Sequence, residues 1–203
     1  MLKIRLSMGG AKKRPVYKVV VADSTFGSIE NELSVLEPIG AEVNFADADT
    51  DEKRIASCWD ADAVLLERGP FNRNVIEKLD KCKILVRYGV GYDEIDVSAA
   101  TDNGIAVANV PDYCVEEVAD HALLLLLALE RRLITVHNTS VSGLREWNFR
   151  PFRKVERLRG KVAEVVGLGR IGSAFAKKVD ALGLEVLGHA DKGLSGGIDY
   201  AWQ

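Results

Sequence analysis

Long apolar runs are missing from this chain. The longest, ALLLLLAL at 122–129, has eight residues, whereas a helix needs about 20 apolar residues to cross the hydrocarbon core of a bilayer. The first residues are basic and lack the apolar segment of a secretory signal peptide. We therefore expect a cytoplasmic protein with no membrane partner.

Cysteine is scarce as well, with three residues in a chain of 203. Cys58, Cys82 and Cys114 show neither the close spacing of redox motifs nor that of metal ligands. We therefore expect reduced thiols and predict no metal site. Internal repeats are also absent, which excludes a repeat architecture.

Acidic residues are missing from one part of the chain only. Residues 1–18 carry six basic side chains and no acidic one, while the whole chain has a net charge of -3. A short basic head on an acidic body indicates two origins or two roles.

What the chain does contain is an alternation of short apolar runs with helical segments. Several runs are apolar throughout, which is typical of parallel strands buried on both faces. The predicted strands are 16–22, 41–45, 63–66, 83–87 and 105–109, and the predicted helices lie near 28–37, 51–58, 72–80 and 95–102. This spacing indicates β-α-β units, so we predict an α/β fold with a flavodoxin-like parallel sheet over residues 16–109.

The rhythm changes at Pro111, which biases the preceding residue away from helix. A long helix is predicted over 114–133, followed by a strand at 162–166, a helix and a strand at 184–189. We interpret residues 110–203 as an incomplete Rossmann dinucleotide-binding domain, and residues 1–15 as a basic extension.

The second region contains a Gly-x-Gly-x-x-Gly motif at Gly167, Gly169 and Gly172. In a phosphate-binding loop the first glycine permits the tight turn, the second lets the backbone approach the pyrophosphate, and the third lets the helix pack on its strand. A glycine-rich turn that only joins strand to helix would look the same. Glu164 is unexpected, because a carboxylate inside a buried strand needs a partner or solvent. Asp191 is the candidate for binding the adenosine ribose.

Three stretches together resemble the D-isomer-specific 2-hydroxyacid dehydrogenases, nearest to the branch of phosphoglycerate dehydrogenases and C-terminal-binding-protein corepressors. They are RYGVGYDEIDVSAATDNGIAVANVPDYCVEEVADHALLLLLALERR (87–132), LRGKVAEVVGLGRIG (158–172) and ALGLEVLGHAD (181–191). The resemblance covers about residues 17–203. It implies an NAD-dependent oxidoreductase of D-2-hydroxy or 2-keto acids, with NADP not excluded, whose active site lies in a cleft between two domains.

The resemblance also assigns residues. The turn Gly89-Val90-Gly91 would hold the substrate carboxylate through backbone N–H groups, and Val90 would also touch the cofactor. The loop that would hold the pyrophosphate consists of Gly167, Leu168, Gly169, Arg170, Ile171 and Gly172. The long helix would contribute to a homodimer.

Several features depart from the family pattern. Asp191 lies one place later than the family's ribose-binding acid, and Glu164 stands where glycine is usual. The catalytic Arg, Glu and His of the family have no counterpart in the chain, which we therefore interpret as C-terminally truncated and expect to have impaired turnover. A nucleotide-binding regulatory module without catalysis is the alternative.

The basic head has a separate resemblance. Residues 1–24 resemble the start of the sixteenth protein of the bacterial small ribosomal subunit. That resemblance implies RNA contact through the phosphate-neutralising side chains of Lys12, Lys13 and Arg14. A solvated basic tail without function explains the same residues.

Overall fold

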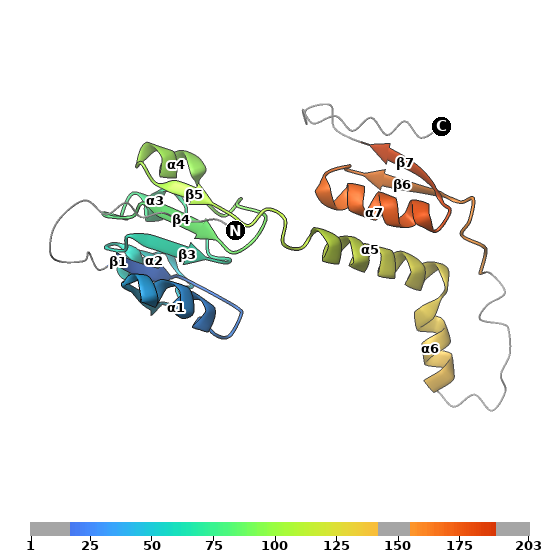
Figure 1. Cartoon of the computed structure of the whole chain (residues 1–203), viewed down its shortest axis with the longest axis horizontal. Coiled ribbons are helices and arrows are strands. Elements are labelled where there is room, and N and C mark those ends of the chain that lie inside the picture. The colour runs from blue at the N-terminus through green and yellow to red at the C-terminus, as the bar shows by residue number, and fades with distance from the viewer. Residues whose placement is uncertain (1–16, 142–154, 190–203) are drawn as a thin grey trace. The chain divides into compact units, whose positions relative to one another are not determined.

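The computed structural model describes residues 17–141 and 155–189 and shows two compact units, divided between Tyr113 and Cys114 (Figure 1). The division lies beyond the predicted boundary at Asn109. The reason is that the backbone N–H of Val110 donates to Gly89 O at 3.1 Å, which keeps this segment with the first unit. The basic extension, including Lys12, Lys13 and Arg14, lies outside the described residues.

The first unit is built on a five-stranded parallel sheet in the order β2-β1-β3-β4-β5. The strands are β1 (Tyr17–Val21), β2 (Ala41–Phe45), β3 (Ala63–Leu66), β4 (Ile84–Arg87) and β5 (Ala106–Ala108). The predicted flavodoxin-like sheet is therefore confirmed. Its strand order places a topological switch point between β1 and β3, at the carboxyl edge of the sheet.

The helices of this unit are α1 (Glu30–Leu36), the 3-10 helix η1 (Glu37–Ile39), α2 (Asp51–Cys58), α3 (Arg73–Ile76) and α4 (Val97–Asp102). Side chains of Thr50, Asn72 and Asp96 accept hydrogen bonds from the first turns of α2, α3 and α4, as N-caps do. Helix α3 is shorter than predicted because the N–H of Asp80 donates to Trp59 O at 2.8 Å and leaves the helical path.

The core lies between the sheet and α2–α4. Val20, Val64, Leu66 and Leu85 contribute from the strands, and Phe71 from the segment after β3. The thiols of Cys58 and Cys82 are buried and free. Burial raises the pKa of Cys82 to about 11.

Two loops at the carboxyl edge of the sheet are bound to each other. The carboxylate of Asp23, after β1, accepts hydrogen bonds from three consecutive backbone N–H groups after β3, those of Glu67 (2.6 Å), Arg68 (3.0 Å) and Gly69 (2.5 Å). In return the N–H and hydroxyl of Thr25 donate to the Glu67 carboxylate. Hydrogen bonds to an ionised acceptor are stronger than neutral ones, so this exchange orders the edge where candidate site residues lie.

The second unit consists of α5 (Val115–Glu130), α6 (Leu133–Val141), β6 (Val162–Val166), α7 (Arg170–Ala181) and β7 (Glu185–His189). Strands β6 and β7 pair in parallel with α7 as their crossover. Helix α5 packs against α7, and Lys178 Nζ lies 2.7 Å from both Glu116 Oε2 and Asp120 Oδ1.

The long helix predicted over 114–133 is present as α5 but ends three residues earlier, and a second helix follows it. Helix α5 ends at Glu130, and α6 begins at Leu133 in a different direction (Figure 1). Between them Arg132 has a φ of 53°, a left-handed conformation that ends an α-helix. No helix among the described residues is long and apolar enough to span a membrane.

The core permits a direct test. Leu85→Ala removes a side chain that is 0% exposed and should lower the free energy of unfolding by about 2–5 kcal/mol. Val35→Ala, at a position 67% exposed, should change it by less than about 0.5 kcal/mol. Urea unfolding followed by circular dichroism gives both values, and similar effects for the two variants would contradict this core.

Candidate functional site

The turn Gly89–Gly91 follows the carboxyl end of β4, and two of its carbonyl groups accept hydrogen bonds. Gly89 O accepts from the N–H of Val110, and Val90 O accepts from Asn109 Nδ2 at 2.7 Å. The N–H groups of Gly89, Val90 and Gly91 find no acceptor within residues 17–141 and 155–189. The turn therefore presents donors that an external carboxylate can bind.

Arg87 adds a cation to this turn. A Cβ atom at Gly89 would overlap the Arg87 guanidinium, so a larger residue there would have to displace that side chain. The Arg87 side chain is 18% exposed, with Nη2 3.8 Å from Glu94 Oε1. Its Nε is buried without a hydrogen-bond partner among the described residues. Sequence analysis missed Arg87, although a charged residue ending a buried strand is a signal that can be read.

The glycine loop in the second unit meets the geometric needs of a phosphate cradle. Gly167 has a φ of +95°, which favours glycine, and a Cβ at Gly172 would overlap the Gly167 carbonyl oxygen. A Cβ at Gly169 would meet nothing within 4 Å. Gly169, the second glycine of the motif, therefore leaves open space beside the loop and is not required for packing inside the unit.

The start of α7 supplies the donors. Gly169 is the N-cap and provides no side-chain cap. The N–H groups of Leu168, Gly169, Ile171 and Gly172 have no acceptor in the part of the chain that the structure describes. Unpaired N–H groups and the helix dipole together favour a bound anion, so this loop fits a pyrophosphate.

Glu164 does not lie inside a core. It is on the face of the β6–β7 sheet opposite α7, with its side chain 61% exposed, and its Oε1 lies 2.8 Å from His189 Nε2. The carboxylate therefore has both solvent and a partner. Asp191, the candidate ribose-binding acid, is outside the described residues.

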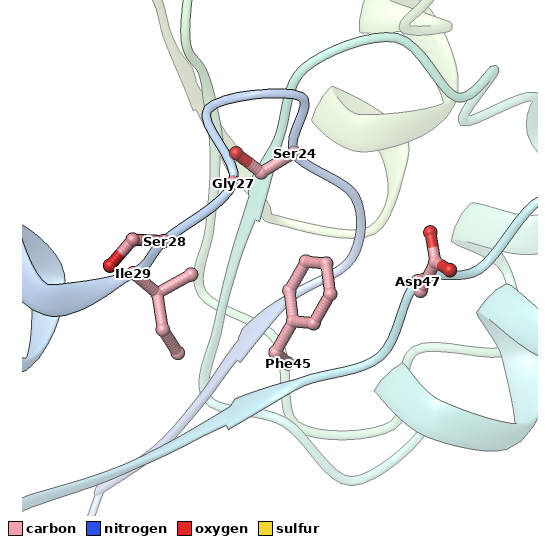
Figure 2. A pocket seen from close by; sticks show the side chains of 6 residues that line it. All are labelled: Ser24, Gly27, Ser28, Ile29, Phe45 and Asp47. Carbon is pink, nitrogen blue, oxygen red and sulfur yellow. The ribbon is translucent and has the colours of Figure 1, made fainter.

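A cavity of about 340 Å³ opens at the carboxyl ends of β1 and β2. Figure 2 shows the Phe45 ring, Ser24 and Asp47 around it, with Ile29 on the opposite wall. The hydroxyls of Ser24 and Ser28 accept hydrogen bonds from the N–H groups of Phe26 and Glu30. Sequence analysis did not single out these residues, because they come from separate loops without a motif.

No histidine is placed beside the Gly89–Gly91 turn within the first unit. His121 on α5, His137 on α6 and His189 on β7 all belong to the second unit. Among residues 17–141 and 155–189 there is also no cluster of acidic, His or Cys side chains that could hold a metal ion.

A flavodoxin-like sheet followed by a glycine-loop β-α-β unit defines a protein of the doubly wound α/β class. The model of the family described as D-isomer specific 2-hydroxyacid dehydrogenase, catalytic domain, matches residues 19–198. The chain belongs to this family, as the sequence resemblance predicted.

Individual relatives support the same family assignment. A D-3-phosphoglycerate dehydrogenase from Methanocaldococcus jannaschii is 38% identical over 173 residues, covering 85% of this chain and 32% of that protein. The chain thus spans about a third of the length of the curated relatives that it matches. An acyclic imino acid reductase solved with NADPH and D-Arg has a TM-score of 0.76 and 26% identity, over 90% of this chain and 58% of that one. The TT0316 protein from Thermus thermophilus has a TM-score of 0.75 and 28% identity, over 88% of this chain and 58% of that one.

The glycine loop gives a paired prediction. Gly172→Ala places a methyl group against the Gly167 carbonyl and should destabilise the second unit by about 1–3 kcal/mol. Gly169→Ala meets open space at a φ of -69° and should change stability by less than about 0.5 kcal/mol. Amide hydrogen exchange of β6 and α7 measures both; equal protection in the two variants would refute the packing role of Gly172.

Proposed function

We propose that this chain carries two binding parts of an NAD(P)-dependent oxidoreductase acting on small 2-hydroxy or 2-keto acids. The first unit binds the substrate carboxylate at Gly89, Val90 and Gly91. The second binds the cofactor pyrophosphate along residues 167–172. The observation that carries the proposal is of the same kind in both places: backbone N–H groups without an acceptor among the described residues. They are those of Gly89, Val90 and Gly91 in the first unit, and those of Leu168, Gly169, Ile171 and Gly172 in the second.

The chemistry of each part follows from its donors. At the first turn the amides and the nearby Arg87 guanidinium orient a carboxylate, so that the adjacent C2 carbon of the substrate is held in place. At the second, Gly169 lets the backbone approach the phosphates and the start of α7 faces their charge. The nicotinamide, when bound, accepts or supplies the hydride. The reductase solved with NADPH supports the cofactor class, and Asp191 is the proposed ribose contact.

Proton transfer is the step for which these residues provide no group. Hydride transfer from a hydroxyl carbon requires a base within hydrogen-bond reach of that hydroxyl. The Arg, Glu and His that the family resemblance implies have no counterpart that we assign in this chain, and His189 is paired with Glu164. We infer that the 203-residue chain by itself binds ligands without useful turnover, which is also the behaviour of a nucleotide-binding regulatory module.

Calorimetry with NADH tests the cofactor part on the chain as it is. Wild type should bind with measurable heat, and Gly169→Ala should weaken binding about tenfold at unchanged stability, because its methyl group occupies the space of the pyrophosphate. No heat at millimolar NADH would remove the cofactor proposal. NADH oxidation with glyoxylate, hydroxypyruvate or pyruvate would instead overturn the expected lack of turnover.

The exposed apolar side chains of the second unit support a homodimer. Leu124, Leu125 and Leu129 on α5 are 53%, 53% and 78% exposed, and Leu133 and Ile134 on α6 are 49% and 66% exposed. Exposed apolar side chains in this number on two successive helices are typical of a protein interface. A second copy of the chain is the partner that the family resemblance implies.

Sedimentation provides the test of the homodimer. Leu129→Lys should shift the chain from dimer to monomer, because it brings a charge into the apolar interface. Val35→Lys, at a similarly exposed apolar position of the first unit, is the matched control and should leave the dimer intact. A wild-type monomer at high micromolar concentration would rule out the dimer.

A further inference from the structure

Tyr88 is the residue immediately before the Gly89–Gly91 turn, and its side chain connects that turn to two other elements. Its hydroxyl donates to Glu32 Oε1 on α1 at 2.7 Å. Its ring packs edge-on against Phe26, in the loop after β1, with centroids 5.9 Å apart and planes at 80°. Its backbone N–H donates to Leu66 O on β3 at 2.9 Å.

These contacts differ in kind from ordinary core packing. Phe26 is 64% exposed, so the ring contact lies at the surface. The loop that carries it is the one bound to Glu67–Gly69 through Asp23. Burial is the main cause that raises the pKa of Tyr88 above its usual value, and the hydrogen bond to Glu32 is the second. The negative charges of Glu32, Asp23 and Glu67 raise this pKa further. The hydroxyl is therefore a permanent donor at neutral pH.

The turn itself needs an external support. Glycines have more backbone freedom than any other residue, and two of the three residues after Tyr88 are glycines. Because the peptide group is planar, the hydrogen bonds to the carbonyls of Gly89 and Val90 also orient the N–H groups of Val90 and Gly91. The Gly89 N–H belongs to the Tyr88–Gly89 peptide, whose carbonyl accepts no hydrogen bond among the described residues. A side chain anchored just before the turn restricts the path of the backbone through it.

We propose that Tyr88 is a positioning residue that, through Glu32 and Phe26, holds the Gly89–Gly91 turn in the shape that receives a substrate carboxylate. This inference rests on the proposed function, in which that turn binds the carboxylate. Preorganisation of the donors lowers the ordering cost of binding. Tyr88 acts on affinity without touching the substrate.

Three variants separate this role from simple packing. Tyr88→Phe removes the hydrogen bond to Glu32 and keeps the ring contact with Phe26. Glu32→Gln keeps an oxygen acceptor for the Tyr88 hydroxyl. It should therefore retain most of the wild-type pyruvate affinity and of the wild-type protection from exchange at the turn. Tyr17→Phe is the control, because Tyr17 is the first residue of β1 and lies at the amino edge of the sheet, away from the turn.

The experiment uses the full chain labelled with ¹⁵N. Pyruvate titration should move the amide signals of Gly89, Val90 and Gly91 in wild type. Tyr88→Phe should weaken that binding about 3- to 10-fold, which corresponds to the net free energy of one typical intramolecular hydrogen bond. It should also speed hydrogen exchange at the three amides of the free protein. In wild type an ultraviolet titration should show one tyrosine ionising later than the rest, and Tyr88→Phe should lose that transition.

The outcomes are separable. If Tyr88→Phe lowers the melting temperature but leaves both pyruvate affinity and exchange at the turn unchanged, Tyr88 is a packing residue and the proposal falls. If wild type does not bind pyruvate, the substrate part of the proposed function fails. In that case the exchange comparison in the free chain still decides whether Tyr88 orders the turn.

Discussion

Parallel hydrogen bonding between the strands of the first unit brings the carboxyl ends of all five strands to one edge. Every loop with candidate chemistry in that unit leaves the sheet there, as is usual for open α/β sheets. The loops at this edge need hydrogen bonds or contacts of their own, because the hydrogen bonds between strands do not extend into them. The Asp23 carboxylate supplies the strongest of these by binding three consecutive amides after β3. The loop that carries Asp23 also carries Phe26, whose ring contacts Tyr88 just before the Gly89–Gly91 turn.

Both candidate binding parts offer backbone amides as donors, joined in the first unit by the Arg87 guanidinium. Donors of this kind need glycine nearby, but for different physical reasons at each position. At Gly89 a side chain would displace the Arg87 guanidinium, and at Gly172 it would strike the Gly167 carbonyl. At Gly169 the neighbourhood is empty. That empty space leaves room for a phosphate beside the backbone of the loop.

Much of the fold was predictable because its patterns are local. Strands β2 and β3 and helix α2 have the predicted boundaries, since the residues that define each of them are close together in the sequence. The helix predicted over 114–133 was wrong at its end, because its apolar pattern continues while Arg132 adopts a left-handed conformation. Glu164 illustrates the same limit: its exposure and its pairing with His189 depend on which face of β6 the helix α7 covers.

The amino-acid sequence by itself determined the family, the α/β class and the two glycine turns, because these depend on residue types at fixed spacing. Only the tertiary structure decided which donors are free and which side chains support them. Arg87 over Gly89, Asp23 across to the β3 loop and Tyr88 on Glu32 join residues 2, 44 to 46 and 56 positions apart. Contacts over the longer separations arise when parallel strands converge at one edge, and no local pattern encodes them.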